Sequence, residues 1–338
     1  MPENGFSLIN VNGLSNVAIK LLDMLEKSVG WAVSPKGSRN DFEEAIKYYK
    51  KSIEEDTSIP PLVKASKIAA ARKELTQYFN HGNIISNTIA YLKQDSKIDN
   101  VDFNWLVRFF EAAGCVSDND IQDLWAKVLT GTLQQGNFSF RALETLQNMS
   151  KQEAIIFQKL LKYITFSNST YFLFSYGFSG FSSNYSEAIN PIKSEGLTFA
   201  DDVFLMQECG ILTNYPMGVH GDDPSFEIRN QRIIGVVTPK TKHSKKHILE
   251  GYVLTSVGTQ LFNSIVANEP SVSFAPVLAD DGKSFQNMGD LYFYLCLKKL
   301  KANKGLDVKA YILKKPYDIT HPNNERICFP NDILLTLE

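Results

Sequence analysis

Residues 122–154 read QDLWAKVLTGTLQQGNFSFRALETLQNMSKQEA, and this stretch decides the fold of the first half of the chain. From residue 121, apolar side chains recur every three or four positions, so they share one stripe of a helix. They are Ile121, Leu124, Trp125, Val128 and Leu129. Turn-forming residues at 131–137 then interrupt the pattern. The stretch predicts helices joined by short turns.

Capping residues predict where three helices begin. Ser117 and Asp120 have the S-x-x-D spacing of a capping box, in which side chains accept the first free backbone N–H groups. Ser139 can cap a second helix. Ser150 and Glu153 repeat the capping-box spacing before a third apolar run. We therefore expect three consecutive helices, starting near residues 118, 140 and 151.

The pattern L-W-A-K-x-L-x-G, followed by F-S-x-R-x-L and S-x-x-E-A, resembles the central signature of a bacterial family of uncharacterised proteins, domain of unknown function 2806 (DUF2806). Residues 13–35, 102–110 and 252–262 are also similar to that family. A looser similarity to bacterial abortive-infection proteins implies phage defence and implies no catalytic residue. The main signature positions are Trp125, Lys127, Gly131, Ser139, Arg141 and Glu153.

These signature positions are expected to be structural. Trp125 lies on the apolar stripe, which favours a core anchor over a ligand contact. Arg141 lies just inside a helix start, where an internal ion pair is favoured over a ligand contact.

Composition limits the class of protein. With 338 residues, of which 43% are hydrophobic, the chain can bury the cores of two domains. The formal net charge of −2 argues against a globally basic nucleic-acid binder. Four scattered cysteines, without C-x-x-C spacing, indicate reduced thiols and a cytoplasmic protein.

Residues 14–33 form the best candidate for membrane contact. The segment is amphipathic, as membrane-surface helices are, but its polar face carries charges of both signs. Packing into the protein core is therefore favoured over peripheral membrane contact. The sequence also contains no apolar run of about 18 residues, the length that a spanning helix needs.

Periodicity predicts an α+β protein that is mainly α. Residues 1–149 read as a helical domain, in which 40–55 and 60–92 can form a hairpin, with an interruption possible near 81–83. These N-terminal helices are candidates for contact with a protein partner or for homo-oligomer formation.

Residues 150–267 suggest a winged-helix-like α+β domain, and 268–338 a small αβ C-terminal extension. In the second domain the predicted elements follow the order helix, helix, hairpin, helix. They are a helix at 151–164, a buried strand at 171–174, a helix at 199–209, strands at 233–237 and 248–254, and a helix from 256. The extension should contain a helix at 290–301 and a strand at 308–313.

The predicted hairpin turn carries the densest charge cluster of the chain. Four lysines and two histidines with no acid between them could contact the phosphates of DNA or RNA. A solvated loop also explains the cluster and is favoured over binding. The residues are Lys240, Lys242, His243, Lys245, Lys246 and His247.

Catalytic and metal-binding patterns are weak. His243 and His247 have H-x3-H spacing without nearby cysteines, which does not define a zinc site. The acid pairs at 201–202 and 280–281 could hold a cation, although such pairs beside turns usually cap them. Because no nucleophile elbow or phosphate loop is present, we predict no cofactor, no metal and no catalytic residue.

Three functional hypotheses follow. A non-enzymatic interaction or sensor protein of phage defence is favoured, on the basis of the family resemblance. Nucleic-acid binding through the lysine-rich turn is the second. An undetected hydrolase or nuclease is the third, and it would need acidic side chains that converge in one pocket.

Overall fold

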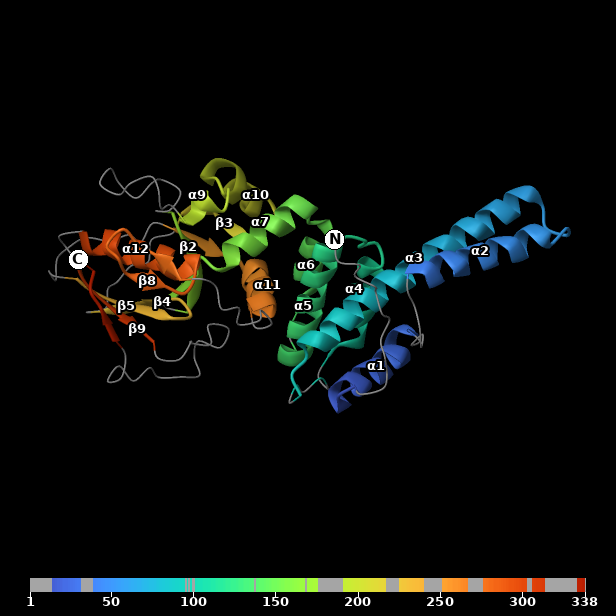
Figure 1. Cartoon of the computed structure of the whole chain (residues 1–338), viewed down its shortest axis with the longest axis horizontal. Helices are drawn as coiled ribbons and strands as arrows, with labels where there is room; N and C mark the ends of the chain where they lie inside the picture. Colours follow the sequence, from blue (N-terminus) through green and yellow to red (C-terminus); the bar gives the residue numbers. More distant parts are fainter. Residues whose placement is uncertain are drawn as a thin grey trace. The chain divides into compact units, whose positions relative to one another are not determined.

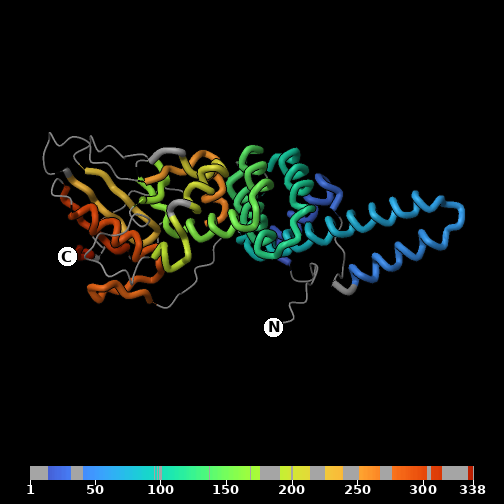
Figure 2. The backbone as a smooth tube through the Cα atoms, turned by 90° about the horizontal axis from the view of Figure 1, so that it is seen from above, coloured from blue at the N-terminus to red at the C-terminus, as the bar shows by residue number. Residues whose placement is uncertain are grey.

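The chain divides into two compact units, residues 1–147 and 148–338, which are described separately. Figures 1 and 2 show the fold of each unit in a computed structural model. The residues whose structure is described are 14–31, 39–94, 96, 98, 101–136, 138–167, 169–175, 191–216, 225–239, 251–266, 276–302, 306–313 and 333–337.

The described part of the first unit is helical, as predicted. Its helices are α1 (Asn16–Val29), α2 (Arg39–Glu55), α3 (Pro61–Tyr91), α4 (Phe103–Ala113), α5 (Asn119–Gln135) and α6 (Phe140–Asn148). Helices α2 and α3 form a long antiparallel hairpin, which is the extended pair of blue helices in Figure 2. The second half of α3 packs against α5.

Helix α3 is continuous, so the interruption considered near residues 81–83 is wrong. Tertiary contacts hold this segment in the helix. Asn80 donates to the Gly114 carbonyl at 2.8 Å, and Asn83 donates to the Gln122 side chain at 3.2 Å. Close packing of α3 on α5 therefore outweighs the low helix propensity of glycine and asparagine.

The predicted helix starts are nearly right, but the first cap is a different residue. Asp118, not Ser117, caps α5, and its carboxylate accepts from the backbone N–H groups of the second and third helical residues at 3.1 and 3.3 Å. Ser139 accepts from a backbone N–H of α6 at 3.2 Å, as predicted. The capping box of Ser150 and Glu153 is also confirmed.

Aromatic rings form the centre of the first unit. The Trp125 side chain is 1% exposed, and its ring lies 5.1 Å from that of Phe109, centroid to centroid. Phe109 in turn stacks on Trp105 at 5.1 Å. Helix α1 packs against α4 and buries its apolar stripe within this unit, at Ala18, Leu21, Leu22 and Leu25.

An eight-stranded antiparallel sheet forms the centre of the second unit, which confirms the α+β class. The strand order is β10-β9-β5-β4-β1-β2-β6-β3. The strands are β1 (Ile164–Ser167), β2 (Thr170–Phe174), β3 (Leu212–Pro216), β4 (Phe226–Arg229), β5 (Ile233–Pro239), β6 (Gly251–Leu254), β9 (Leu306–Ile312) and β10 (Ile333–Leu335). A separate short ribbon pairs β7 (Val277–Leu278) with β8 (Ser284–Phe285).

Helices accompany the sheet. They are α7 (Lys151–Leu161), α9 (Pro191–Ser194), the π-helical turn η1 (Phe199–Val203), α10 (Phe204–Glu208), α11 (Ser256–Val266) and α12 (Met288–Ala302). The predicted helix 151–164 ends early, because Ile164 already belongs to β1. The predicted buried strand at 171–174 is confirmed as β2, and the strand at 308–313 as β9.

The predicted hairpin between residues 233–237 and 248–254 is wrong. Strand β5 pairs with β4 and β9, whereas β6 pairs with β2 and β3. The apolar residues of β5 suit a central strand, which needs neighbours on both edges, but apolar pattern alone does not choose those neighbours. The winged-helix-like arrangement, which requires this hairpin, is therefore not confirmed.

Helix α12 covers one face of the sheet by packing on β5 and β9 (Figure 1). A Cβ atom at Gly235 of β5 would lie 2.4 Å from a Leu297 methyl group, so the helix and this strand are in close contact. The Tyr292 hydroxyl donates to the Phe174 carbonyl at 2.5 Å. Gly235 therefore faces α12, and its immediate neighbours in β5, such as Val236, point to the other face of the sheet.

Replacement of Gly258 by alanine should destabilise the second unit. A Cβ atom on this α11 residue would lie 2.3 Å from the carbonyl oxygen of Ile211, which backbone geometry fixes. Alanine gains about 1 kcal/mol of helix propensity. We expect the overlap to outweigh that gain and to lower the free energy of unfolding by about 1–3 kcal/mol.

Denaturant unfolding of the variant and of the wild type measures this change. Ser256→Ala, an exposed position two residues earlier in α11, is the matched control and should change stability little. Equal or greater stability of Gly258→Ala would show that α11 does not approach Ile211 as closely as described.

Candidate functional site

The sheet face opposite α12 carries polar and charged side chains. Cross-strand pairing sets these side chains in rows, because directly opposed residues point to the same face. In one row Val236 of β5 lies between Glu227 of β4 and Lys309 of β9. In the next row Ile234 lies between Arg229 and Tyr311.

This face forms an open pocket with a volume of about 780 Å³. Strands β1, β4, β5 and β9 supply most of its wall. The lining residues are Phe166, Ser167, Ser169, Ser225, Phe226, Glu227, Arg229, Val236, Thr238, Asp307, Lys309 and Tyr311.

Two cations and two carboxylates alternate across the pocket. Along β4, Glu227 and Arg229 are two positions apart, and along β9 Asp307 and Lys309 are two positions apart. Each pair therefore places a positive and a negative charge side by side on the same face. The Arg229 guanidinium also lies over the Phe166 ring, 5.0 Å from its centroid. The pocket can thus offer hydrogen bonds and charge of both signs to one molecule.

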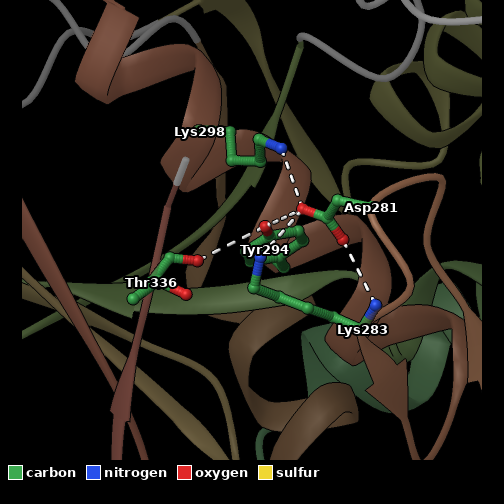
Figure 3. A network of polar contacts seen from close by, with 5 residues as sticks. All are labelled: Asp281, Lys283, Tyr294, Lys298 and Thr336. Carbon is green, nitrogen blue, oxygen red and sulfur yellow. Dashed lines mark hydrogen bonds and ion pairs between the residues drawn. The ribbon is translucent and has the colours of Figure 1, made fainter.

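A second polar cluster joins the β7–β8 turn to α12 (Figure 3). The Asp281 carboxylate accepts hydrogen bonds from the Tyr294 hydroxyl and, at 3.0 Å each, from the ammonium groups of Lys283 and Lys298. Tyr294 also lies 3.5 Å from the carbonyl of Thr336, just after β10. The cluster therefore links three separate segments of the second unit.

The charges in this cluster satisfy one another. Burial alone would raise the pKa of the Asp281 carboxyl, but hydrogen bonds from Tyr294, Lys298 and Lys283 outweigh burial and hold that pKa well below its usual range. Asp281 is thus ionised and paired with lysines, which is unlike a cation ligand. A structural clasp explains these contacts best.

Signature residue Lys127 lies in a third polar cluster, between α3 and α5. Its side chain is 11% exposed, and its ammonium group lies 3.3 Å from the Asp123 carboxylate. Tyr91 of α3 donates to the same carboxylate at 2.5 Å, and its ring lies under the ammonium group at 5.9 Å. The ion pair lies within α5, and the hydrogen bond from Tyr91 joins it to α3.

The other signature residues are not part of this cluster and belong to more than one helix. Gly131 is buried in α5, and Arg141 is exposed on α6. The Glu153 carboxylate accepts from the Ser150 backbone N–H at 2.5 Å at the start of α7. It also accepts from the Cys209 thiol, and burial together with this carboxylate raises the pKa of Cys209 to about 12. The six signature residues do not gather at one site.

Three cysteines of the described part have free thiols. Cys115 is exposed, Cys209 is partly buried and Cys296 is fully buried, where burial raises its pKa above the usual range. Cys328 lies outside the described residues.

The lysine-rich segment predicted to bind nucleic acid, Lys240 to His247, lies outside the described residues. Its place along the chain is nevertheless informative. It begins directly after Pro239, the last residue of β5, and Thr238 of the same strand lines the pocket. Nucleic-acid contact through this segment stays a prediction.

Metal ligands and membrane-spanning helices are two further features to consider in the described part of the chain. There, no group of three His, Cys, Asp or Glu side chains is arranged to hold a metal ion. Among the helices that the structure describes, none is both long and apolar enough to cross a membrane.

The fold and pocket define an α+β protein with an open, polar pocket on one face of an antiparallel sheet. A family model described as "Protein of unknown function (DUF2806)" matches residues 68–279. Because the match covers more than half of the 338 residues, the chain belongs to this family, and the predicted resemblance to DUF2806 is confirmed. The similar stretch predicted at residues 13–35 lies outside the matched range. No curated protein and no solved structure shows significant similarity to the chain.

Sequence reasoning missed the pocket, because its residues come from four strands far apart along the chain. One local signal was present. In β4 and β9, buried apolar residues alternate with Glu227, Arg229, Asp307 and Lys309, which is the pattern of a strand with one polar face. The pattern predicts exposure of that face, but it cannot show that β5 lies between the two strands.

Replacement of Tyr294 by phenylalanine tests the clasp. The variant keeps the ring and loses the hydrogen bond to the Asp281 carboxylate, and hydrogen bonds to charged groups are worth more than neutral ones. We expect the free energy of unfolding to fall by about 1–2 kcal/mol, measured by denaturant unfolding. Tyr48→Phe, at a tyrosine that is 75% exposed on α2, is the control. Equal stability of both variants would argue against the clasp.

Proposed function

We propose that this protein is a cytosolic, non-enzymatic sensor in bacterial phage defence, and that the sheet pocket binds the molecule to which it responds. The observation that carries this proposal is the pocket itself. Its volume of about 780 Å³ falls within the range of about 300–1,000 Å³ that is usual for small-molecule sites.

The lining of the pocket supports binding of a polar molecule. Glu227 is partly exposed, and Asp307 and Lys309 are exposed on the same face. Charged groups that bind a ligand give it orientation and specificity as well as affinity. The place in phage defence rests on the similarity to abortive-infection proteins described above.

The helical hairpin of α2 and α3 supports a second part of the proposal, a protein partner or a second copy of the chain that receives the signal. Large exposed hydrophobic side chains gather there, and such side chains often mark interaction surfaces. Four of the ten found on the described residues belong to this hairpin: Tyr48, Tyr49, Leu62 and Val63.

Pocket variants should abolish phage protection. We expect bacteria that carry the wild-type gene to give fewer phage plaques than cells without it. Lys309→Glu and Glu227→Lys should restore plaque formation, because each reverses a charge that the pocket offers to its ligand. Plaque counts at equal protein levels measure the effect.

Lys301→Glu and Glu208→Lys are the controls, since both residues are exposed in the second unit and neither lines the pocket. Full protection by each of the two single pocket variants would rule out the pocket as the sensing site. Absence of protection by the wild-type gene against a broad panel of phages would reject the role in defence.

Nucleic-acid binding is the second candidate function. The specific observation in its favour is the run of four lysines and two histidines without an acid, from Lys240 to His247. Along the chain, this segment begins directly after Pro239, the residue that follows pocket residue Thr238.

Replacement of the four lysines between 240 and 246 by alanine should weaken association with DNA or RNA and flatten its dependence on salt. Each phosphate contact releases counterions, so the loss of several contacts lowers the slope of affinity against salt. Retention on a nucleic-acid column at increasing salt measures this. Unchanged retention of the quadruple variant would exclude the segment as the binding surface.

A further inference from the structure

The row that crosses the pocket has a cation at one end, a carboxylate at the other and an apolar residue between them. Val236 pairs with Glu227 on one side and with Lys309 on the other. Neighbouring strands are about 4.8 Å apart, so the Cα atoms of Glu227 and Lys309 are about 9–10 Å apart. In the described part of the chain neither side chain forms an ion pair.

A ligand with one charge meets both attraction and repulsion in this pocket. An anion drawn to Lys309 also lies near the carboxylate of Asp307, two positions along β9. A cation drawn to Glu227 also lies near the guanidinium of Arg229, two positions along β4. Like charges at such distances reduce affinity and discriminate against simple ions.

A ligand with two opposite charges meets the same repulsions but offsets them, because it gains an attraction at each of its two ends. Its ammonium group can contact Glu227, its anionic group can contact Lys309, and the apolar segment between them can lie on Val236. The hydroxyl group of Thr238, which lines the pocket on the strand next to that of Lys309, can donate to the anionic end.

We propose that the pocket binds a zwitterion, a small molecule whose amine and acidic group are separated by a short apolar chain. This inference rests on the proposed role of the pocket as a binding site, and it adds the chemical class of the ligand. Amino acids whose amine is at the far end of the chain from the carboxylate, short peptides and amino-alkyl phosphates share this chemistry.

Calorimetric titration of the full-length protein tests the proposal with matched probes. ε-Aminocaproate carries both charges, whereas hexanoate and hexylamine each carry one of them on a chain of the same length. We expect ε-aminocaproate to bind at least about tenfold more tightly than either single-charge probe. Phosphoethanolamine in a parallel titration shows whether a phosphate can replace the carboxylate.

Charge-reversal variants sharpen the test. Glu227→Lys should weaken ε-aminocaproate binding by about tenfold and strengthen hexanoate binding, because three of the four pocket charges are then positive. Lys309→Glu should weaken ε-aminocaproate binding by the same factor and strengthen hexylamine binding. The double variant should recover binding, since the zwitterion can bind in the reverse orientation.

Lys301→Glu and Glu208→Lys, two exposed charge reversals away from the pocket, should leave all affinities unchanged. The proposal of a zwitterionic ligand would be overturned if hexanoate bound as tightly as ε-aminocaproate, or if the double variant did not recover binding. Either result would leave the proposed sensing role intact. Absence of binding by ε-aminocaproate and phosphoethanolamine would also overturn the proposal of a zwitterionic ligand. The proposed sensing role is tested separately by the plaque assay. It would fail if the pocket variants left phage protection unchanged.

Discussion

Burial of α12 on all sides is the constraint on which the second unit depends. Every residue from Gly289 to Leu297 is buried, which is unusual for a helix of a globular protein because most have a solvated face. One side of α12 contacts the sheet through Leu297, and the β7–β8 ribbon and α9 pack against other sides of it. Because α12 covers and buries one face of the sheet, charged strand residues can lie only on the opposite face. The pocket is a consequence of this arrangement.

The ends of α12 show how a buried helix holds its charged groups. Near its start, Asp290 is 4% exposed and accepts from Asn230 of the β4–β5 turn at 3.0 Å. Burial raises the pKa of Asp290 to about 6, although Asn230 and Arg232 oppose this shift. Near its end, Lys298 contacts Asp281 in the clasp. These contacts tie α12 to the turn that follows pocket strand β4 and to the β7–β8 turn.

Local chemistry could be predicted from the sequence, and strand pairing could not. Caps such as Ser150 with Glu153 depend on residues three positions apart, so their pattern is visible in the chain. The Asp118 cap was misassigned by one position because serine and aspartate both suit it. The partners of β5 are fixed by contacts with β9, about seventy residues later, and by α12 packing. The predicted hairpin and the missed pocket share this non-local cause.

The family match covers one part of the pocket lining and not the other. Residues 68–279 include Glu227, Arg229 and all of β5, whereas Asp307 and Lys309 of β9 lie beyond the match. Strand β9 pairs with β5 over seven residues, and its apolar side chains contact the buried helix α12. The wall that supplies one cation and one carboxylate therefore comes from the same C-terminal segment that completes the core. Because one segment serves both purposes, changes to the exposed alternating positions of β9 can alter the charges of the pocket while its buried positions keep the sheet intact.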